Sequence, residues 1–439
     1  MPKELEQIKQ AVFAKRPVLA DIAKKHGGQT LKAYIADSWA VPAAAPDPVF
    51  LETLKSQIAP VYGRPAAEKA AAQLLAKPLV STIDHHGIWG HPFFVNSALI
   101  YSLHFKPGEL SITFSTESVS LNNTSSWSGS ILWHGENLKT RRASFFTDRQ
   151  KHLPVFSAPA ITEANITRFK NRTSGQLNNL LGALNILPAQ NFSAQACLMS
   201  QNLWQAVFPS APALVYVPLE TLVMKYLEKV FGDPGHLLSR LILTGEGRAL
   251  WQKFFGDEHT FMFWGIDAKG RRQVLKSLSQ APEVLKLMAE RKIYPSSPLC
   301  FAVLLFAGFA CAGGFNQTTW LTQTKEKLAV LLMELSGGGQ ASAEKISNLP
   351  TQNFAESSLA WLKIGGRFAA PTAADLFLTG KDYYGQYQKL AAQLTLEQSL
   401  NLAMPEIYEV VVPKAERPVD DLQILQQRIF SDLPLEGHF

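Results

Sequence analysis

An uncharged run of 18 residues, "PLCFAVLLFAGFACAGGF" at 298–315, constrains the fold more than any other stretch of the chain. A run of this length approaches what is needed to cross the hydrocarbon core of a membrane. Its last third consists of small residues, and no second run or aromatic-and-basic flank accompanies it. An all-round apolar helix also suits the centre of a large protein. We therefore expect a buried core helix at 298–312, and keep a membrane segment as the alternative.

The length of 439 residues exceeds the roughly 250–300 over which a single hydrophobic core grows. Apolar residues make up 46% and charged residues 18%, a composition typical of a large buried interior. We divide the chain into three regions. They are an N-terminal helical segment and linker (1–48), an α+β core with the candidate site (49–277), and a mainly helical region packed on that core (278–439).

Alternating apolar and polar residues dominate the middle of the chain. The segments "GELSITFSTESVSL", "SGSILWHGEN" and "TRRASFFTDR" have this period of two and are separated by Gly, Asn and Asp, which indicates an antiparallel meander with one wet face. "HTFMFWGIDAKGRRQVLK" at 259–276 predicts a β-hairpin. Helical patterns precede and follow. The expected class is therefore α+β, with N-terminal helices, a central mostly antiparallel sheet and a largely helical C-terminal half.

The formal charge of +6 is a mild bias for this length. A nucleic-acid partner is not expected, because its binders concentrate basic residues on one face or in one run. The densest basic spots are the pairs Arg141–Arg142 and Arg271–Arg272, each in or beside a probable hairpin. Both pairs are explained if alternate residues of a hairpin strand face water. Either pair could instead hold an anionic group of a substrate.

Three separated cysteines, Cys197, Cys300 and Cys311, form neither a disulfide framework nor a cysteine zinc site. The first 28 residues alternate charged and apolar positions without a continuous apolar stretch, so they do not resemble a signal peptide. A cytoplasmic location is the resulting expectation. The oligomeric state does not follow from the sequence.

Four of the ten histidines fall within residues 80–104, three of them in "IDHHGIWGH". This stretch places Asp84, His85, His86 and His91 directly after a likely buried strand, where loops often carry function. Histidine is both the usual proton shuttle and the commonest metal ligand, and a neighbouring carboxylate can fix its tautomer. We interpret the stretch as the candidate catalytic site, with His85, His86 and Asp84 as catalytic residues.

Two kinds of chemistry fit this stretch. In the first, His85, His86 and His91 bind zinc, manganese or iron, and the metal activates water. His134 and Glu136, in "LWHGE", alternate onto one strand face and are further candidate metal ligands. In the second, a histidine acts as a metal-free general base of a group (acyl) transferase. In a third interpretation, the protein is not catalytic and these polar groups only shape a pocket for a small ligand.

Two short resemblances concern the same residues. "IDHHG" is similar to the signature of the DHH phosphoesterases, which implies a manganese-dependent enzyme, but the Asp-x-Asp loop of that family is not found upstream. "HHGIWG" is similar to the HHxxxDG motif of condensation-type acyltransferases, with Gly90 in place of the aspartate. Neither resemblance assigns the chain to a family.

Polar residues elsewhere are candidates for substrate binding. Amide and hydroxyl groups gather in "LNNTSSWSG", whose Trp127 can supply a stacking wall, and two further amides follow the uncharged run. The candidates are Asn96, Asn122, Asn123, Trp127, Asn316 and Gln317. No glycine-rich phosphate-binding motif is present, so the sequence supports no nucleotide cofactor. The leading hypothesis is a metal-assisted hydrolase of a small polar substrate.

Overall fold

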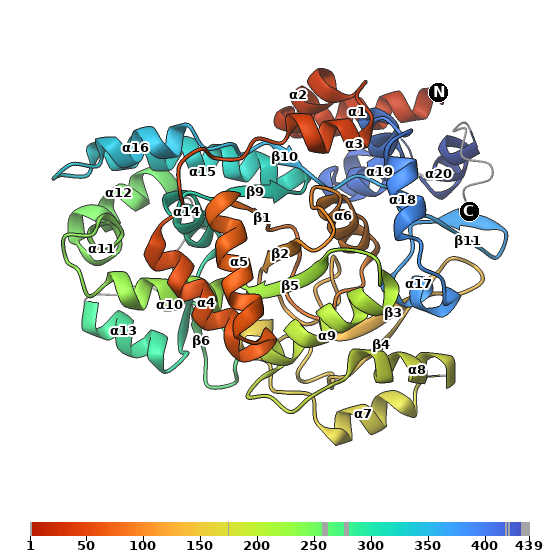
Figure 1. The fold of residues 1–439 in the computed structure, drawn as a ribbon, viewed down its shortest axis with the longest axis horizontal. Coiled ribbons are helices and arrows are strands. Elements are labelled where there is room, and N and C mark those ends of the chain that lie inside the picture. The colour runs from red at the N-terminus through yellow and green to blue at the C-terminus, as the bar shows by residue number, and fades with distance from the viewer. Residues whose placement is uncertain are drawn as a thin grey trace.

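A five-stranded parallel sheet forms the centre of the protein in a computed structural model that describes residues 2–173, 175–256, 262–275, 281–417, 419 and 422–431 (Figure 1). Its strand order is β10-β9-β1-β2-β5, and every neighbouring pair is parallel. The strands are β1 (Leu79–Ser81), β2 (Leu110–Ser115), β5 (Ala213–Pro218), β9 (Ala310–Gly313) and β10 (Asn353–Phe354).

The prediction of a mostly antiparallel central sheet is therefore wrong. The misleading segment was "GELSITFSTESVSL", because the serines and threonine of β2 gave it an alternating pattern. Ser111, Thr113 and Ser115 do not face water: each is at most 1% exposed, and all of β2 is buried in the sheet. Several other strands of this sheet span only two to four residues, too short to show any periodicity.

Helices cover both faces of the sheet, since alternate residues of β1, β5 and β9 enter two different hydrophobic clusters. On β9, for example, Ala310 and Ala312 join one cluster and Cys311 joins the other. The helices of the first cluster are α1 (Lys3–Lys15), α2 (Pro17–His26), α3 (Leu31–Ala33), the π-helix η1 (Tyr34–Ser38), α6 (Pro92–Ser102), α7 (Glu163–Lys170), α8 (Gly175–Leu184), α9 (Phe192–Val207), α17 (Ala373–Thr379), α18 (Tyr384–Ala391), α19 (Leu396–Val411) and α20 (Leu422–Ser431).

The second cluster draws mainly on helices that follow β5, together with the pair α4–α5 that precedes the sheet (Figure 1). Its helices are α4 (Pro48–Tyr62), α5 (Arg64–Ala76), α10 (Leu219–Val230), α11 (Leu237–Leu243), α12 (Gly245–Phe255), α13 (Ala281–Ala289), α14 (Ser297–Phe306), α15 (Phe315–Glu334) and α16 (Gln340–Ser347). Two short 3-10 turns, η2 (Val155–Ser157) and η3 (Lys414–Glu416), complete the helical elements.

Smaller antiparallel sheets flank the central one. The segments around 130–144 pair as the hairpin β3 (Ser130–His134) and β4 (Thr140–Ser144), as the alternating pattern predicted. The hairpin predicted at 259–276 is confirmed within the described residues as β6 (Phe263–Ile266) and β7 (Arg272–Val274), and β6 also pairs with β8 (Ile293–Pro295). A last pair joins β11 (Leu362–Ile364) to β12 (Arg367–Ala369).

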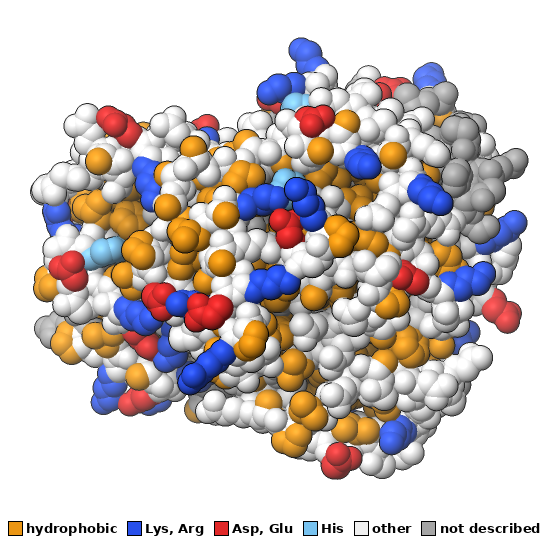
Figure 2. Space-filling model, in the orientation of Figure 1, with side chains coloured by type: hydrophobic (Ala, Val, Ile, Leu, Met, Phe, Trp, Pro, Cys, Tyr) orange, Lys and Arg blue, Asp and Glu red, His pale blue; other side chains and the backbone are white. Residues whose placement is uncertain are grey.

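The uncharged run at 298–315 is buried, but it is not one helix. Its first part belongs to the ten-residue α14, and its glycine-containing end forms the parallel strand β9. Within the described part of the chain, no helix is both long enough and apolar enough to cross a membrane. Charged side chains of both signs are interspersed on the face of the molecule shown in Figure 2.

The strand order contains one topological switch point. From β1 the chain moves to β2 and then β5 on one side, whereas β9 and β10 lie on the other side of β1. The helices that follow the two strands flanking this point also differ: α6 packs mainly in the first cluster, and α15 mainly in the second. The loops that leave β1 and β9 therefore diverge at their carboxyl ends, which opens a crevice where ligands of such sheets usually bind.

Candidate pocket at the carboxyl edge of the sheet

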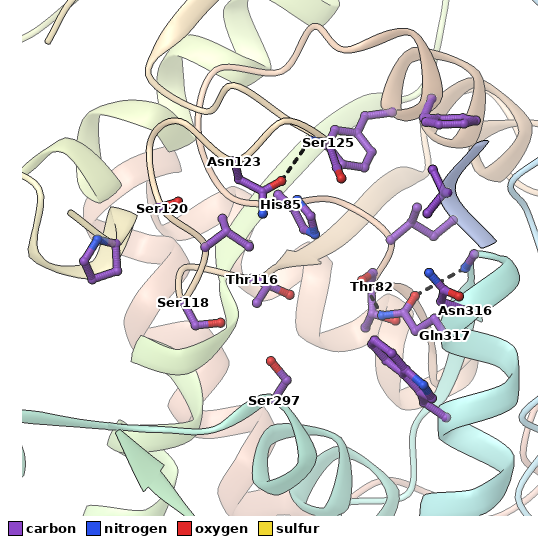
Figure 3. Close-up of a pocket in the computed structure, with 18 of the residues that line it drawn as sticks. Thr82, His85, Thr116, Ser118, Ser120, Asn123, Ser125, Ser297, Asn316 and Gln317 are labelled. Carbon is purple, nitrogen blue, oxygen red and sulfur yellow. Dashed lines mark hydrogen bonds between the residues drawn. The ribbon is translucent and has the colours of Figure 1, made fainter. Parts of the chain in front are cut away.

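A pocket of about 680 Å³ occupies this crevice (Figure 3). Most of its lining comes from the segments that follow β1, β2, β9 and β10, and from the first turns of α6, α14 and α15. Figure 3 shows the ring of His85 and the hydroxyls of Thr116 and Ser297 around one cavity. Its volume lies within the range of about 300–1,000 Å³ that is typical of small-molecule sites.

Gln317 joins the two strands at the switch point. Its Nε2 donates to the carbonyl oxygen of Thr82 at 2.6 Å, and the backbone N–H of Thr82 donates to the carbonyl of Ala312 at 3.1 Å. The neighbouring Asn316 accepts a hydrogen bond from Nε of Arg16 at 2.7 Å. The two amides predicted to bind substrate, Asn316 and Gln317, do line the pocket. Gln317 also has a structural role, because its side chain bonds to the backbone of Thr82 after β1.

Glu356 is the only carboxylate among the described residues that line this pocket. It follows β10, is 8% exposed, and accepts the backbone N–H of Phe315 at the start of α15 through Oε2 at 2.9 Å. Burial raises the pKa of Glu356 to about 7, although the Phe315 hydrogen bond acts in the opposite direction. A carboxyl group with this pKa can both donate and accept a proton near neutral pH.

His85 is the one histidine of "IDHHGIWGH" that lines the pocket. Its ring packs edge-on against Phe94, with 5.3 Å between the ring centroids, and its Nδ1 is buried without a hydrogen-bond partner among the described residues. Burial lowers the pKa of His85 to about 4. The imidazole is therefore neutral at pH 7 and can accept a proton or a hydrogen bond.

Hydroxyl and amide groups from the segment after β2 line the pocket beside His85. They are Thr116, Ser118, Ser120, Asn123 and Ser125. Asn123 Oδ1 accepts the backbone N–H of Ser125 at 2.9 Å, so this loop is held by its own side chain (Figure 3). Asn123, a predicted substrate-binding residue, thus lines the pocket.

His86 points away from the pocket into the core. Its Nε2 lies 2.9 Å from the carbonyl of Ser193 and must donate to it, so Nδ1 accepts a hydrogen bond from the Ser115 hydroxyl at 2.6 Å. The ring is fully buried and stacks on Tyr216. Both nitrogens of His86 are engaged within the protein, which leaves neither free for a metal or a substrate.

The other predicted metal ligands are also dispersed. His91 caps the start of α6, where its Nδ1 accepts the backbone N–H of Phe93 at 3.3 Å. His134 lies at the end of β3, and its Nδ1 is 2.7 Å from Oδ2 of Asp375. Glu136 is exposed in the turn after β3. Across the residues that the structure describes, no three His, Cys, Asp or Glu side chains are grouped so as to hold a metal ion.

Asp84 is buried beneath the pocket and does not line it. Neither carboxylate oxygen has a hydrogen-bond partner among the described residues, and the nearby Tyr216 hydroxyl donates to the carbonyl of His85 at 3.1 Å. Burial raises the pKa of Asp84 well above its usual range. Burial therefore favours the protonated form of Asp84, and its carboxyl group makes no hydrogen bond that orients His85.

Three further predicted substrate residues contact the protein itself. Asn96 accepts the backbone N–H groups of Leu359 and Ala360, each at 2.6 Å. Trp127 packs under the guanidinium of Arg142 at 3.7 Å from the ring centroid. Asn122 lies beside the pocket residue His152, with 3.4 Å between Nδ2 and Nδ1. None of the three lines the pocket.

Several pocket residues were not proposed from the sequence, among them Glu356, Trp320 and the hydroxyls of Thr82, Thr116, Ser118 and Ser297. Glu356 had a usable signal, because it is a lone charge in the otherwise uncharged segment 351–362. The hydroxyl residues had none, since serine and threonine are common in every kind of loop.

Comparison with known proteins gives no relative from which a role can be read: no family model matches the chain, and no curated protein or solved structure is significantly similar to it. The geometry of the pocket is therefore the basis for its function.

Proposed function

We propose that the protein binds a small hydroxyl-bearing molecule in the pocket at the carboxyl edge of its parallel sheet. The observation that carries this proposal is the pocket's position at the switch point between β1 and β9, where about half of the lining side chains are neutral hydrogen-bonding groups. Such groups exchange hydrogen bonds with hydroxyls at low desolvation cost, whereas most of a charged ligand would need matching charges.

Aromatic side chains support the same ligand class. Phe93 and Phe315 line the pocket beside the switch point, and Trp320 lines it with 54% of its surface exposed. A flat apolar wall facing hydroxyl and amide groups suits a molecule with one C–H-rich face and several hydroxyls. A sugar or polyol has this character.

Filling the pocket tests the proposal. Ser297 is partly exposed at the first turn of α14 and lines the pocket, so Ser297→Trp places an indole in the cavity. Ser56→Trp, at an exposed position of α4, is the matched control. Thermal-shift and calorimetric titrations with glycerol, D-ribose and D-glucose should show binding to the wild type and to Ser56→Trp. Binding that survives in Ser297→Trp, or that occurs with none of the three compounds, contradicts the proposal.

A second candidate function is metal-free acid–base chemistry on the bound molecule. The observation that favours it is the pair of opposite pKa shifts in one pocket: Glu356 is raised to about 7 and His85 is lowered to about 4. Two groups whose pKa values are shifted apart in this way can serve as acid and base at one pH. Of the two chemistries expected from the sequence, this candidate corresponds to the metal-free one, with a histidine general base; the described residues bring no set of three candidate metal ligands together.

The acid–base candidate is tested on a compound that binds. Product formation, followed by NMR, should decline above about pH 7 as Glu356 loses its proton. Glu356→Gln should retain binding but lose turnover by about 100-fold or more. Turnover that is unchanged in Glu356→Gln would reject this role and leave the binding proposal intact.

A further inference from the structure

One wall of the pocket is a hairpin that carries two arginines. Arg271 and Arg272 line the pocket from the start of β7. The turn before them is held by Asp267, whose Oδ1 accepts the backbone N–H groups of Lys269 and Arg271, both at 2.8 Å. The hydroxyl of Ser157 donates to the carbonyl of Gly270 at 2.6 Å, which joins the turn to η2. The arginines are therefore presented by an anchored turn.

The two arginines differ in what their charges contact. Both Nε and Nη2 of Arg271 lie 2.9 Å from Oδ2 of Asp267, so its charge is compensated within the turn. Arg272 forms no ion pair with the acidic residues that the structure describes; its guanidinium lies over the ring of Trp264, 4.4 Å from the centroid. Stacking uses the flat face of a guanidinium, so the N–H edge is the part of Arg272 that can donate hydrogen bonds to an oxyanion.

The charged groups of the pocket come from different elements. Glu356 lies where the strands end, next to the first turn of α15, while Arg272 belongs to the separate β6–β7 hairpin. An anionic group of the ligand would be repelled by the Glu356 carboxylate. Placed at Arg272, the same group would gain a charge-assisted hydrogen bond. Ser120, Asn123 and Ser125 line the same pocket as neutral donors.

We propose that the molecule bound in this pocket carries an oxyanion, and that Arg272 binds this group while the neutral hydroxyl and amide groups bind the rest. This inference rests on the proposed function and adds the substrate class: a phosphorylated or carboxylated polyol or sugar. Phosphate and carboxylate both present two oxygens that can accept parallel hydrogen bonds from a guanidinium.

Matched compounds distinguish the neutral body from the anionic group. Calorimetric titrations would compare glycerol with glycerol 3-phosphate and glycerate, D-ribose with ribose 5-phosphate and ribonate, and D-glucose with glucose 6-phosphate and gluconate. In at least one set an anionic member should bind about tenfold or more tightly than its neutral parent, since a hydrogen bond to a charged group is worth this much. The phosphate and carboxylate members show which oxyanion is preferred, and inorganic phosphate alone should bind more weakly than the phosphorylated compound.

Variants of Arg272 assign the effect to one side chain. Arg272→Gln should remove the preference for the anion and leave the affinity for the neutral parent unchanged, whereas Arg272→Lys should retain part of it. Arg64→Gln, at an exposed site on α5, is the control. Equal affinity for neutral and anionic members in all three sets, or an anion preference that persists in Arg272→Gln, overturns the inference. If Ser297→Trp abolishes binding of the neutral compounds, the proposed function holds whichever result the Arg272 variants give.

Discussion

Glu117 and Glu220 each receive a hydrogen bond from the backbone beside the other. The N–H of Glu117 donates to Oε2 of Glu220 at 2.6 Å, and the N–H of Thr221 donates to Oε2 of Glu117 at 2.8 Å. Both side chains are fully buried, at the carboxyl ends of β2 and β5. Oε1 of Glu220 also accepts the N–H of Ser118, a pocket residue, at 3.0 Å. This carboxylate pair therefore positions one wall of the pocket.

The pair predicts a loss of stability as pH rises toward about 8. Burial, together with the neighbouring Glu117 carboxylate, raises the pKa of Glu220 to about 8, from 4.5 in an unfolded chain. The folded state thus holds more protons between these values, so the free energy of unfolding decreases as pH rises and levels off above about pH 8. Glu356 and Glu406, each with a pKa of about 7, act in the same direction.

Buried histidines act in the opposite direction, but only at lower pH. The pKa of His85 is about 4 in the folded protein and 6.5 in the unfolded chain, so its contribution is lost as pH falls below 6.5. Urea unfolding between pH 6.5 and 8.5 therefore reports mainly on the buried carboxyl groups, Asp84 included, at up to ~1.4 kcal/mol per pH unit for each proton. Glu220→Gln should reduce this slope, and the surface variant Glu52→Gln should keep it. An unchanged slope in Glu220→Gln would show that Glu220 carries no extra proton.

His85 and His86 are adjacent in sequence and should respond differently to replacement. His86→Ala removes hydrogen bonds to Ser115 and Ser193 and leaves a cavity beside Tyr216, so we expect a loss of about 3–4 kcal/mol in unfolding free energy. His85→Ala should cost about 1 kcal/mol and lower ligand affinity, because this ring borders an existing pocket. Urea denaturation and ligand titration measure both effects. Equal stability losses in the two variants would contradict the assignment.

Asp375 should be essential for the fold rather than for the pocket. Its Oδ1 accepts the N–H of His134, and its Oδ2 contacts His134 Nδ1, the Thr372 N–H and the Thr372 hydroxyl. Asp375→Ala leaves these buried groups unpaired, so we expect a loss of about 3 kcal/mol in unfolding free energy without a change in ligand affinity for the protein that remains folded. Asp148→Ala, at a side chain that is 97% exposed, is the control and should change stability little. A loss below about 1 kcal/mol would contradict this role.

Gly314 should tolerate no side chain, because of its contact with Glu356. A Cβ at this position would overlap Oε2 of Glu356. Gly314→Ala must therefore move the carboxylate off the start of α15, and we expect a loss of about 1–3 kcal/mol in stability together with weaker ligand binding. Gly182→Ala in α8 meets no atom within 4 Å and should instead stabilise the protein by about 0.5–1 kcal/mol. A melting temperature of Gly314→Ala at or above that of the wild type would contradict the steric argument.

The candidate site was located from sequence only in part. The stretch "IDHHGIWGH" does lead from a buried strand into a pocket, but only His85 of its three histidines lines that pocket. Consecutive residues of a loop point in different directions, so neighbours in sequence do not share a site unless the backbone turns them together. His86 points into the core and His91 caps a helix, and neither direction can be read from spacing.

The alternating pattern was reliable for the two hairpins, although not for β2. Two hairpins were predicted from alternation and turn residues, and both formed as β3–β4 and β6–β7. The burial of 298–315 also followed directly from its lack of charge. Local hydrogen bonding and side-chain periodicity determine such features, and both are encoded within a few residues.

The sequence by itself thus determined where the chain is buried, where it forms hairpins, and which stretch reaches the site. The tertiary structure alone decided that the central sheet is parallel, that β1 and β9 are neighbours, and that Glu356 and Arg272 line the same pocket as His85. The physical reason is the long sequence separation between the segments that pair. Strands of two to four residues carry too little periodicity to reveal their partners, and a crevice between them exists only once segments more than 200 residues apart have paired.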